Sequence, residues 1–445
     1  MSPIREKISG SILSAIRARR ESASALRGDQ PVHSAGGLAP ASIREASFSD
    51  FDGVAALKQR WGLAADSIEN WERLWRHNPA LMEQNCDRPI GWVLEADGAV
   101  VGYLGNISLL CRYGNKTLTA VASHALVVDP PYRAVGVSLV AAFFRQKSAD
   151  LFLSTSSIEA VGRMALAFKC SPVPQPDYGT VLFWVLRPHP FAQALMKKLE
   201  LKPVVSGIAR TLASAAIETD RIIGGRRLPR PSTAFAISEI SAGEIGDEFQ
   251  TLWVQKLNES PRLLTDRTPA ALRWHYEIPG DRGSVRVLCC HQNGELAGYA
   301  VVRSDTDEQS GLNKSMIADI IARHDDPDVM RALCAAAYDC AKVLGSHVLE
   351  VVGFPPGIRS VCEQWNPYRR KLPACPFFYK AADSTFNQTL SDASAWYACP
   401  FDGDATLIRP SYSRSVLRSD SGMRMAADEV KVVPQVLKRA RTQAS

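Results

Sequence analysis

The sequence lacks long hydrophobic runs and the cysteine spacing of a metal-binding or disulfide-rich protein. No stretch of eighteen consecutive apolar residues occurs among its 445 residues, so the sequence predicts no membrane-spanning helix. Its ten cysteines are scattered and form no CxxC pair, which argues against a zinc site and a disulfide scaffold. These absences predict a reduced, cytoplasmic protein without structural metal.

The composition nevertheless predicts a folded protein with more than one domain. Apolar residues make up 46% of the chain and charged residues 22%, which excludes global disorder. At roughly 100–200 residues per domain, the length favours two or three domains.

The positive charge is concentrated at the two ends of the chain. The net charge is +6, of which residues 1–30 carry +3 and residues 409–445 carry +5, so the body is nearly neutral. This distribution argues against a DNA-binding surface. Residues 3–27 have isoleucines four apart and predict an amphipathic helix. The basic tails could contact a membrane surface or a protein partner, or the helix could pack on its own chain.

The body of the chain contains two similar runs of strands and helices. In each run two apolar strands flank a turn, Asp97-Gly98 in the first and Asn293-Gly294 in the second, which is a strong hairpin signal. The similarity extends to three positions at a constant offset of 196, since Gly98, Gly102 and Tyr103 correspond to Gly294, Gly298 and Tyr299. This repeat predicts two copies of one α/β unit.

The repeat gives a prediction of the domain boundaries. We expect a basic helix and linker at 1–41, a first unit at 42–200, a basic linker at 201–232, a second unit at 233–385, and a C-terminal extension with a basic tail at 386–445. Within the extension, the run from Trp396 to Asp404 predicts a turn that docks this segment, with a role in an acceptor site as the alternative.

The first unit contains a segment whose residue types suit phosphate binding. An apolar strand at Leu126–Val128 is followed by two prolines, and then Arg133-x-x-Gly136-x-Ser138 opens a helix. Small residues there let an anion approach the backbone, and the helix N-terminus with its free N–H groups attracts negative charge. Arg133 adds a fixed cation. The pattern is neither GxGxxG nor a P-loop.

This segment resembles the acyl-CoA signature of the GCN5-related N-acetyltransferase (GNAT) superfamily, Arg/Gln-x-x-Gly-x-Gly/Ala after the fourth strand. Ser138 departs from the signature but is small enough to keep the loop. The resemblance implies mixed α/β sheets flanked by helices, and acetyl-CoA or another acyl-CoA as co-substrate without a metal. The residues that it implies for binding acyl-CoA are Leu126, Val127, Val128, Arg133, Ala134, Val135, Gly136, Val137 and Ser138.

The second unit lacks this signature at the corresponding place. Asp325, Asp326 and Asp328 put negative charge where a diphosphate would lie, and no glycine occurs there. The arrangement resembles double-GNAT proteins, so we expect two tandem GNAT-like mixed sheets with a degenerate second copy that binds no CoA.

Three residues of the first unit are candidates for proton transfer. His124, on the strand before the turn, is a candidate general base, with a hydrogen-bonded core histidine as the alternative. Glu95 could receive a proton through water, or it is a solvated residue at a strand edge. Tyr178 lies near the place where related enzymes often have a tyrosine acid. Trp71 and Trp75 are either core residues or part of an acceptor pocket.

The resemblance implies a CoA-dependent N-acyltransferase that moves an acyl group to a small-molecule amine. An amino sugar of surface-polysaccharide synthesis is one candidate acceptor, by analogy with large tandem GNAT proteins. Two alternatives stay open: an aminoacyl-tRNA-dependent peptidyltransferase of the tandem-GNAT kind, and a non-catalytic acyl-CoA-binding or scaffold protein.

Overall fold

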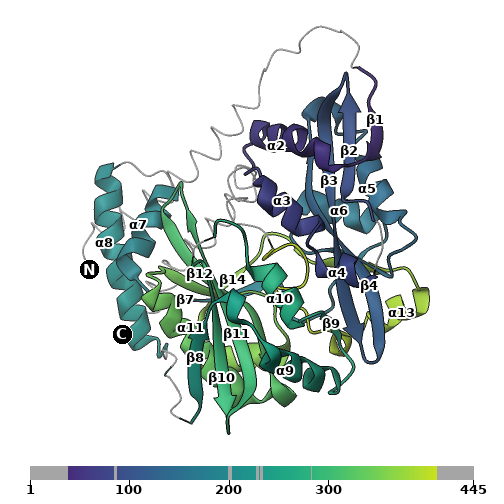
Figure 1. Cartoon of the computed structure of the whole chain (residues 1–445). Coiled ribbons are helices and arrows are strands. Elements are labelled where there is room, and N and C mark those ends of the chain that lie inside the picture. Colours follow the sequence, from purple (N-terminus) through teal and green to yellow (C-terminus); the bar gives the residue numbers. More distant parts are fainter. Residues whose placement is uncertain are drawn as a thin grey trace. The chain divides into compact units, whose positions relative to one another are not determined.

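The computed structural model describes residues 39–84, 88–198, 203–226, 230, 234–281 and 283–407. The helix predicted at 3–27 and the basic tail at 409–445 lie outside these residues. The described chain contains two mixed β-sheets flanked by helices (Figure 1). The predicted fold class is therefore confirmed, while the degenerate nature of the second unit stays an interpretation.

The first sheet has a central long hairpin and one parallel pair. Its strands follow the order β1 (Ser42–Glu45), β2 (Gly91–Ala96), β3 (Ala99–Tyr113), β4 (Lys116–Val128), β5 (Leu151–Ser154), β15 (Phe378–Ala381) and β6 (Ser171–Pro172). All neighbours are antiparallel except β4 and β5. A further strand, β9 (Leu263–Thr265), pairs with the far end of β3.

The second sheet repeats the same order and the same strand directions. It consists of β8 (Ala236–Ile240), β10 (Val285–Gln292), β11 (Glu295–Asp307), β12 (Leu312–Ala322), β13 (Val348–Val351), β7 (Thr180–Val185) and β14 (Tyr368–Lys371). Here β12 and β13 form the parallel pair. The two predicted hairpin turns join β2 to β3 and β10 to β11, and all four turn residues have the positive φ that such turns require.

The two sheets exchange one strand each. Strand β7 lies within the range predicted for the first unit, 42–200, yet it pairs between β13 and β14 of the second sheet. Strand β15 lies within the range predicted for the second unit, 233–385, yet it pairs between β5 and β6 of the first sheet. We expected each strand to belong to the unit in whose range it lies, and the pairing partners of both correct that expectation. Alternation of apolar residues predicts a strand but does not identify its partner.

Helices cover both faces of the first sheet. One face carries α2 (Phe51–Arg60) and α3 (Ile68–Trp75), which pack on β3. The other face carries α5 (Val137–Phe144), which contacts β2 and β3. Gly102 of β3 allows this close packing, because a Cβ there would lie 3.3 Å from a methyl carbon of Leu139. The first unit is completed by α4 (Pro79–Gln84) and α6 (Glu159–Ala167).

The second sheet has the same arrangement of helices. Helices α9 (Asp247–Leu257) and α11 (Pro327–Val343) contact β11, and α10 (Pro269–Tyr276) packs beside α9 (Figure 1). A Cβ on Gly298 would lie 2.8 Å from a methyl carbon of Val329 of α11. Gly298 therefore allows α11 to pack closely on β11, as Gly102 allows α5 to pack on β3. Helix α12 (Pro356–Glu363) packs on α11, whereas α13 (Ser384–Thr389) packs on β15 of the first sheet.

The segment expected to be a linker at 201–232 contains a long helix. Helix α8 spans Pro203–Ile223 and packs on α7 (Pro188–Lys198), as Figure 1 shows. Ala216 and Ile217 of α8 join an apolar cluster with residues of β7, β13 and β14. The arginines, glycines and prolines that indicated a linker lie near its C-terminal end and beyond. None of the helices in the described residues is long and apolar enough to cross a membrane.

Candidate active site

Strand β4 contains a β-bulge close to its C-terminal end. Tyr103 pairs with Val127 and Gly105 pairs with His124, so the β4 residues between them exceed those of β3 by one. Ala125, inside the bulge, has a φ of 54°. From strict alternation we expected His124 to share a face with Leu126 and Val128. The bulge changes this, and His124 shares a face with Val127 instead.

Strands β4 and β5 separate beyond this point. Their parallel pairing ends at Ala122 and Leu153, whereas β4 continues to Val128. Asp129 N–H donates to the Val101 carbonyl, so by alternation the Val128 N–H faces away from β3. Beyond Ala122, no pairing of β4 with β5 is recorded among the described residues. The splayed strand therefore presents backbone donors to the side on which β5 has ended.

The turn after β4 lies directly against the end of that strand. A 3₁₀ turn at Pro130–Tyr132 leads into α5, and Gly136 precedes the helix. A Cβ on Gly136 would lie 2.9 Å from a methyl carbon of Val128, so any larger residue would force the turn away from β4. Arg133 is exposed, and within the described part of the chain no ion pair of its side chain is recorded. A cation is thus available at the turn.

The turn offers fewer free N–H groups than the sequence suggests. The N–H groups of Val135 and Gly136 donate to the Tyr132 carbonyl, and Ser138 N–H donates to Val135 O. The Ser138 hydroxyl donates to the same Val135 carbonyl at 2.7 Å. Among the described residues, no backbone acceptor is recorded for the N–H groups of Ala134 and Val137. These two groups and Arg133 are what the turn can offer an anion.

Asp129 fixes the segment between α2 and α3 at the end of β4. Its carboxylate accepts hydrogen bonds from the Trp61 indole at 2.6 Å and from Arg60 at 2.9 Å. Residues 61–67 therefore lie beside the bulge and the turn. Asp129 belongs to the signature region, but the sequence does not show that it holds this segment.

His124 contacts a carboxylate from a distant part of the chain. Its Nδ1 lies 3.5 Å from Oδ2 of Asp404, and both side chains are buried. Asp404 also accepts hydrogen bonds from the hydroxyls of Thr155 and Ser156, which follow β5, each at 2.9 Å. Asp404 thus reaches the space where β4 and β5 diverge. The sequence indicated that the run from Trp396 to Asp404 docks the C-terminal segment, with a role in an acceptor site as the alternative.

Glu95 lies apart from this pair. Its carboxylate binds Arg44 of β1 with an Nη2–Oε2 distance of 2.8 Å, at the edge of the sheet. Glu95 pairs with Val100 of β3, whereas His124 pairs with Gly105. Five residues along a strand correspond to roughly 16 Å. The structure therefore does not bring Glu95 together with His124.

Tyr178 is enclosed in the core and bonded to the C-terminal segment. Its hydroxyl donates to the Cys399 carbonyl at 3.4 Å, and its ring packs edge-on against Phe377. Burial raises the pKa of Tyr178 well above its usual value, so the phenol stays protonated. This hydrogen bond links Tyr178 to Cys399, and no contact of Tyr178 with His124 or with the turn at 129–138 is recorded among the described residues.

Trp71 and Trp75 are core residues on the face that carries His124. Their rings lie 4.5 Å apart, edge to face, and both side chains are almost fully buried. Trp75 donates its indole N–H to the Asn106 carbonyl at 2.8 Å. The structure places Trp71 against Tyr103 of β3, with 5.8 Å between ring centres.

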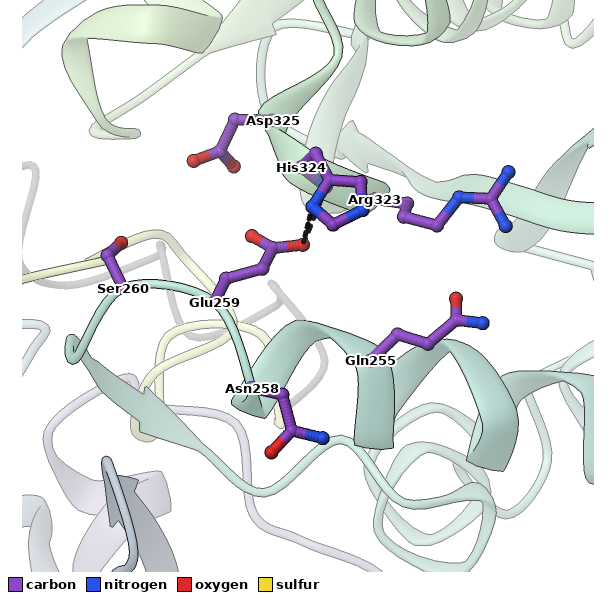
Figure 2. A pocket seen from close by; sticks show the side chains of 7 residues that line it. All are labelled: Gln255, Asn258, Glu259, Ser260, Arg323, His324 and Asp325. Carbon is purple, nitrogen blue, oxygen red and sulfur yellow. Dashed lines mark hydrogen bonds and ion pairs between the residues drawn. The ribbon is translucent and has the colours of Figure 1, made fainter.

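The second sheet has an open, polar hollow at the place that corresponds to the turn after β4. Strand β12 ends at Ala322, and Arg323, His324 and Asp325 follow. These residues line the hollow with Gln255, Asn258, Glu259 and Ser260 (Figure 2).

Acidic groups occupy the positions that would otherwise receive an anion. The Asp326 carboxylate accepts hydrogen bonds from the Asp328 and Val329 N–H groups and so caps α11 itself. Asp325 is paired with Lys256 and Arg262. That the second unit binds no diphosphate stays an expectation.

Comparison with known proteins finds only distant structural likenesses. No protein-family model matches the chain, and no curated protein matches it. The solved structures that it resembles include GCN5-related N-acetyltransferases and N-myristoyltransferases.

A GCN5-related N-acetyltransferase from Anabaena variabilis has 9% identity and a TM-score of 0.48, with 77% of this chain and 73% of that chain covered. One from Kribbella flavida has 11% identity and a TM-score of 0.47, covering 79% and 73%. The N-myristoyltransferase of Saccharomyces cerevisiae has 12% identity and a TM-score of 0.48, covering 79% and 84%. At these identities and TM-scores the likeness to solved structures supports no conclusion about this chain. The fold is described from its own sheet topology.

Proposed function

We propose that the protein is an acyl-CoA-dependent N-acyltransferase whose active site lies at the end of β4 in the first sheet. The observation that carries this proposal is the bulged and splayed end of β4, with the His124–Asp404 contact on one side and the Arg133–Gly136 turn after it. This combination places backbone donors, a fixed cation and a histidine–carboxylate pair within one short stretch of structure.

The residues at the turn fit the diphosphate of an acyl-CoA. Arg133 supplies a positive charge, and the N–H groups of Ala134 and Val137 supply donors at the start of α5. Gly136 keeps the turn close to Val128. The acyl-CoA supplies a thioester carbonyl as the electrophile. The Val128 N–H, which faces away from β3, would hold the carbonyl oxygen, an effect of a few kcal/mol in comparable sites.

His124 would act as general base toward the acceptor. Asp404 accepts from the Nδ1 side of the ring and so orients the imidazole, whose Nε2 would take the proton from the acceptor ammonium. Which ring nitrogen carries the proton follows from this contact. The neutral amine then attacks the thioester carbonyl, the C–S bond breaks, and CoA leaves as a thiolate that takes up the second proton lost by the acylated nitrogen. The acceptor is a small amine, with an amino sugar as one candidate.

Titration calorimetry with acetyl-CoA tests the cofactor site. We expect binding in the micromolar range, weakened about tenfold in Arg133→Ala, because one charge-assisted bond to phosphate contributes about 1.5 kcal/mol. Arg323→Ala is the matched control, since Arg323 follows β12 at the corresponding place and pairs with Glu295. It should leave the affinity unchanged.

Thiol release from acetyl-CoA with a panel of amines then tests the reaction. Release that depends on the amine supports the enzyme. Binding without release would support a non-catalytic acyl-CoA-binding protein instead. If acetyl-CoA and longer acyl-CoAs all fail to bind, or if Arg323→Ala weakens binding as much as Arg133→Ala, the site proposed here is wrong.

A further inference from the structure

Two buried polar groups on the face that carries His124 have no hydrogen-bond partner among the described residues. They are the hydroxyl of Tyr103 and the indole N–H of Trp71. Tyr103 is 0% exposed and Trp71 is 1% exposed. Leaving a buried donor unsatisfied costs about 1–3 kcal/mol, so native proteins seldom do so without a ligand or a water nearby.

Tyr103 lies beside His124. A Cβ on Gly105 would be 2.7 Å from the Tyr103 hydroxyl oxygen and 3.2 Å from Cδ2 of His124, so the two side chains meet over this glycine. Asp404 contacts the opposite, Nδ1 side of the imidazole. The phenol is a donor here, because burial raises the pKa of Tyr103 well above its usual value.

The second sheet shows the same tyrosine with its hydrogen bond made. Tyr299 corresponds to Tyr103, and Asp319 corresponds to His124, since it pairs with Val301 as His124 pairs with Gly105. The Tyr299 hydroxyl donates to Asp319 at 2.8 Å, and Arg267 binds the same carboxylate. In the second sheet the tyrosine hydroxyl is thus hydrogen-bonded to a protein carboxylate. The equivalent Tyr103 hydroxyl of the first sheet has no such partner among the described residues, so it can bind a ligand.

We propose that the Tyr103 hydroxyl and the Trp71 indole N–H bind an oxygen atom of the acceptor, beside the His124–Asp404 pair. This inference rests on the proposed function and specifies its acceptor class. Two neutral donors select a hydrogen-bond acceptor and not an ammonium group. The acceptor is therefore an amine that carries a hydroxyl or carbonyl oxygen close to its nitrogen.

Access to this position involves the segment that joins α2 to α3. Asp66 of this segment binds the Lys58 ammonium at 2.6 Å, and that ammonium lies 5.7 Å from the centre of the Tyr103 ring. Residues 61–67 have no regular secondary structure beyond a turn. Because Tyr103 and Trp71 are buried, the inference requires this segment to move when the acceptor binds.

The test compares trans-2-aminocyclohexanol with cyclohexylamine, which differ by one hydroxyl. With the wild-type protein and acetyl-CoA, the amino alcohol should have the lower KM. Tyr103→Phe should raise its KM about tenfold, the effect of one hydrogen bond, and leave the KM of cyclohexylamine unchanged. If Tyr103→Phe changes the KM of both amines equally, or changes neither, the inference is overturned.

Thermal stability distinguishes a ligand-binding hydroxyl from a structural one. Tyr299→Phe breaks a buried hydrogen bond and should lower Tm by about 2 °C. Tyr103→Phe removes a hydroxyl without a protein partner and should leave Tm unchanged or raise it. A fall equal to that of Tyr299→Phe would mean that Tyr103 binds a structural water only, and the inference fails.

A binding measurement keeps the inference testable if no thiol is released. The shift of Tm caused by each amine in the presence of acetyl-CoA is measured for the wild-type protein and for Tyr103→Phe. A larger shift with the amino alcohol, lost in Tyr103→Phe, supports the acceptor site even where the proposed reaction fails. Equal shifts with both amines in the wild-type protein contradict it whatever the turnover.

Discussion

At the scale of single residues, the candidate base depends on a partner 280 positions away in the chain. His124 is a weak signal in the sequence, because one histidine on an apolar strand is as consistent with a core residue as with a base. Its contact with Asp404 makes it a candidate with a defined orientation. Asp404 is a positioning residue, since it would act on the acceptor only through His124.

Replacing Asp404 by asparagine should lower kcat at least tenfold with little change in the KM of acetyl-CoA, because the amide no longer stabilises a protonated imidazole. Steady-state kinetics over a range of pH measures this, and a shifted pH profile separates a role in proton transfer from a structural one. Asp402→Asn is the control, since Asp402 lies two residues away but binds Arg267. An equal loss of kcat in both variants would contradict the role of Asp404.

At the scale of secondary-structure elements, a small ionic cluster joins the first strand to the first helix. Arg44 of β1 binds Asp50, just before α2, and also Glu95 of β2. The Asp50 carboxylate further accepts the N–H of Ser47, which holds the turn between strand and helix. Glu95, which we considered as a catalytic candidate, is engaged in this cluster.

The cluster predicts a dependence of stability on pH. The hydrogen-bonded guanidinium of Arg44 lowers the pKa of Asp50 to about 2, against an ordinary value of about 3.9 in an unfolded chain. A lowered pKa stabilises the folded state above about pH 4, and this contribution is lost as the pH falls toward 2. Arg44 is partly exposed, so the contribution is about 1 kcal/mol or less.

Asp50→Asn should therefore lower Tm modestly at pH 7, and its Tm should converge with that of the wild-type protein between pH 4 and pH 2. Thermal unfolding across this pH range provides the measurement. Asp52→Asn is a suitable control, because Asp52 lies on the same helix and has no recorded ion pair among the described residues. A constant difference between Asp50→Asn and wild type at all pH values would show that the carboxylate charge contributes nothing.

At the scale of the whole molecule, the exchange of β7 and β15 makes the two sheets depend on each other. The first sheet needs β15 to connect β5 to β6, and the second needs β7 to connect β13 to β14. The segment that carries Asp402 and Asp404 adds a further link, because Asp402 contacts the second unit and Asp404 the first. Neither unit contains all the strands of its own sheet.

A fragment of residues 41–200 should consequently fail to fold alone, since it lacks β15 and exposes the unpaired edges of β5 and β6. Circular dichroism and hydrogen exchange would show the absence of stable tertiary structure. Co-expression with residues 201–445 should restore a soluble complex, and the intact chain should unfold in one transition. A fragment 41–200 that unfolds cooperatively and binds acetyl-CoA would show that the units are independent.

The sequence by itself determined the local structure and the most specific motif. Turn dipeptides such as Asp97-Gly98 and apolar alternation depend on neighbouring residues, so they predicted the hairpins, most strands and most helices. The signature from Arg133 to Ser138 likewise lies in one continuous stretch. Only the tertiary structure decided which sheet β7 and β15 join, where the bulge at Ala125 turns His124, and that Asp404 contacts it. These features arise from contacts between distant segments, which no local pattern encodes.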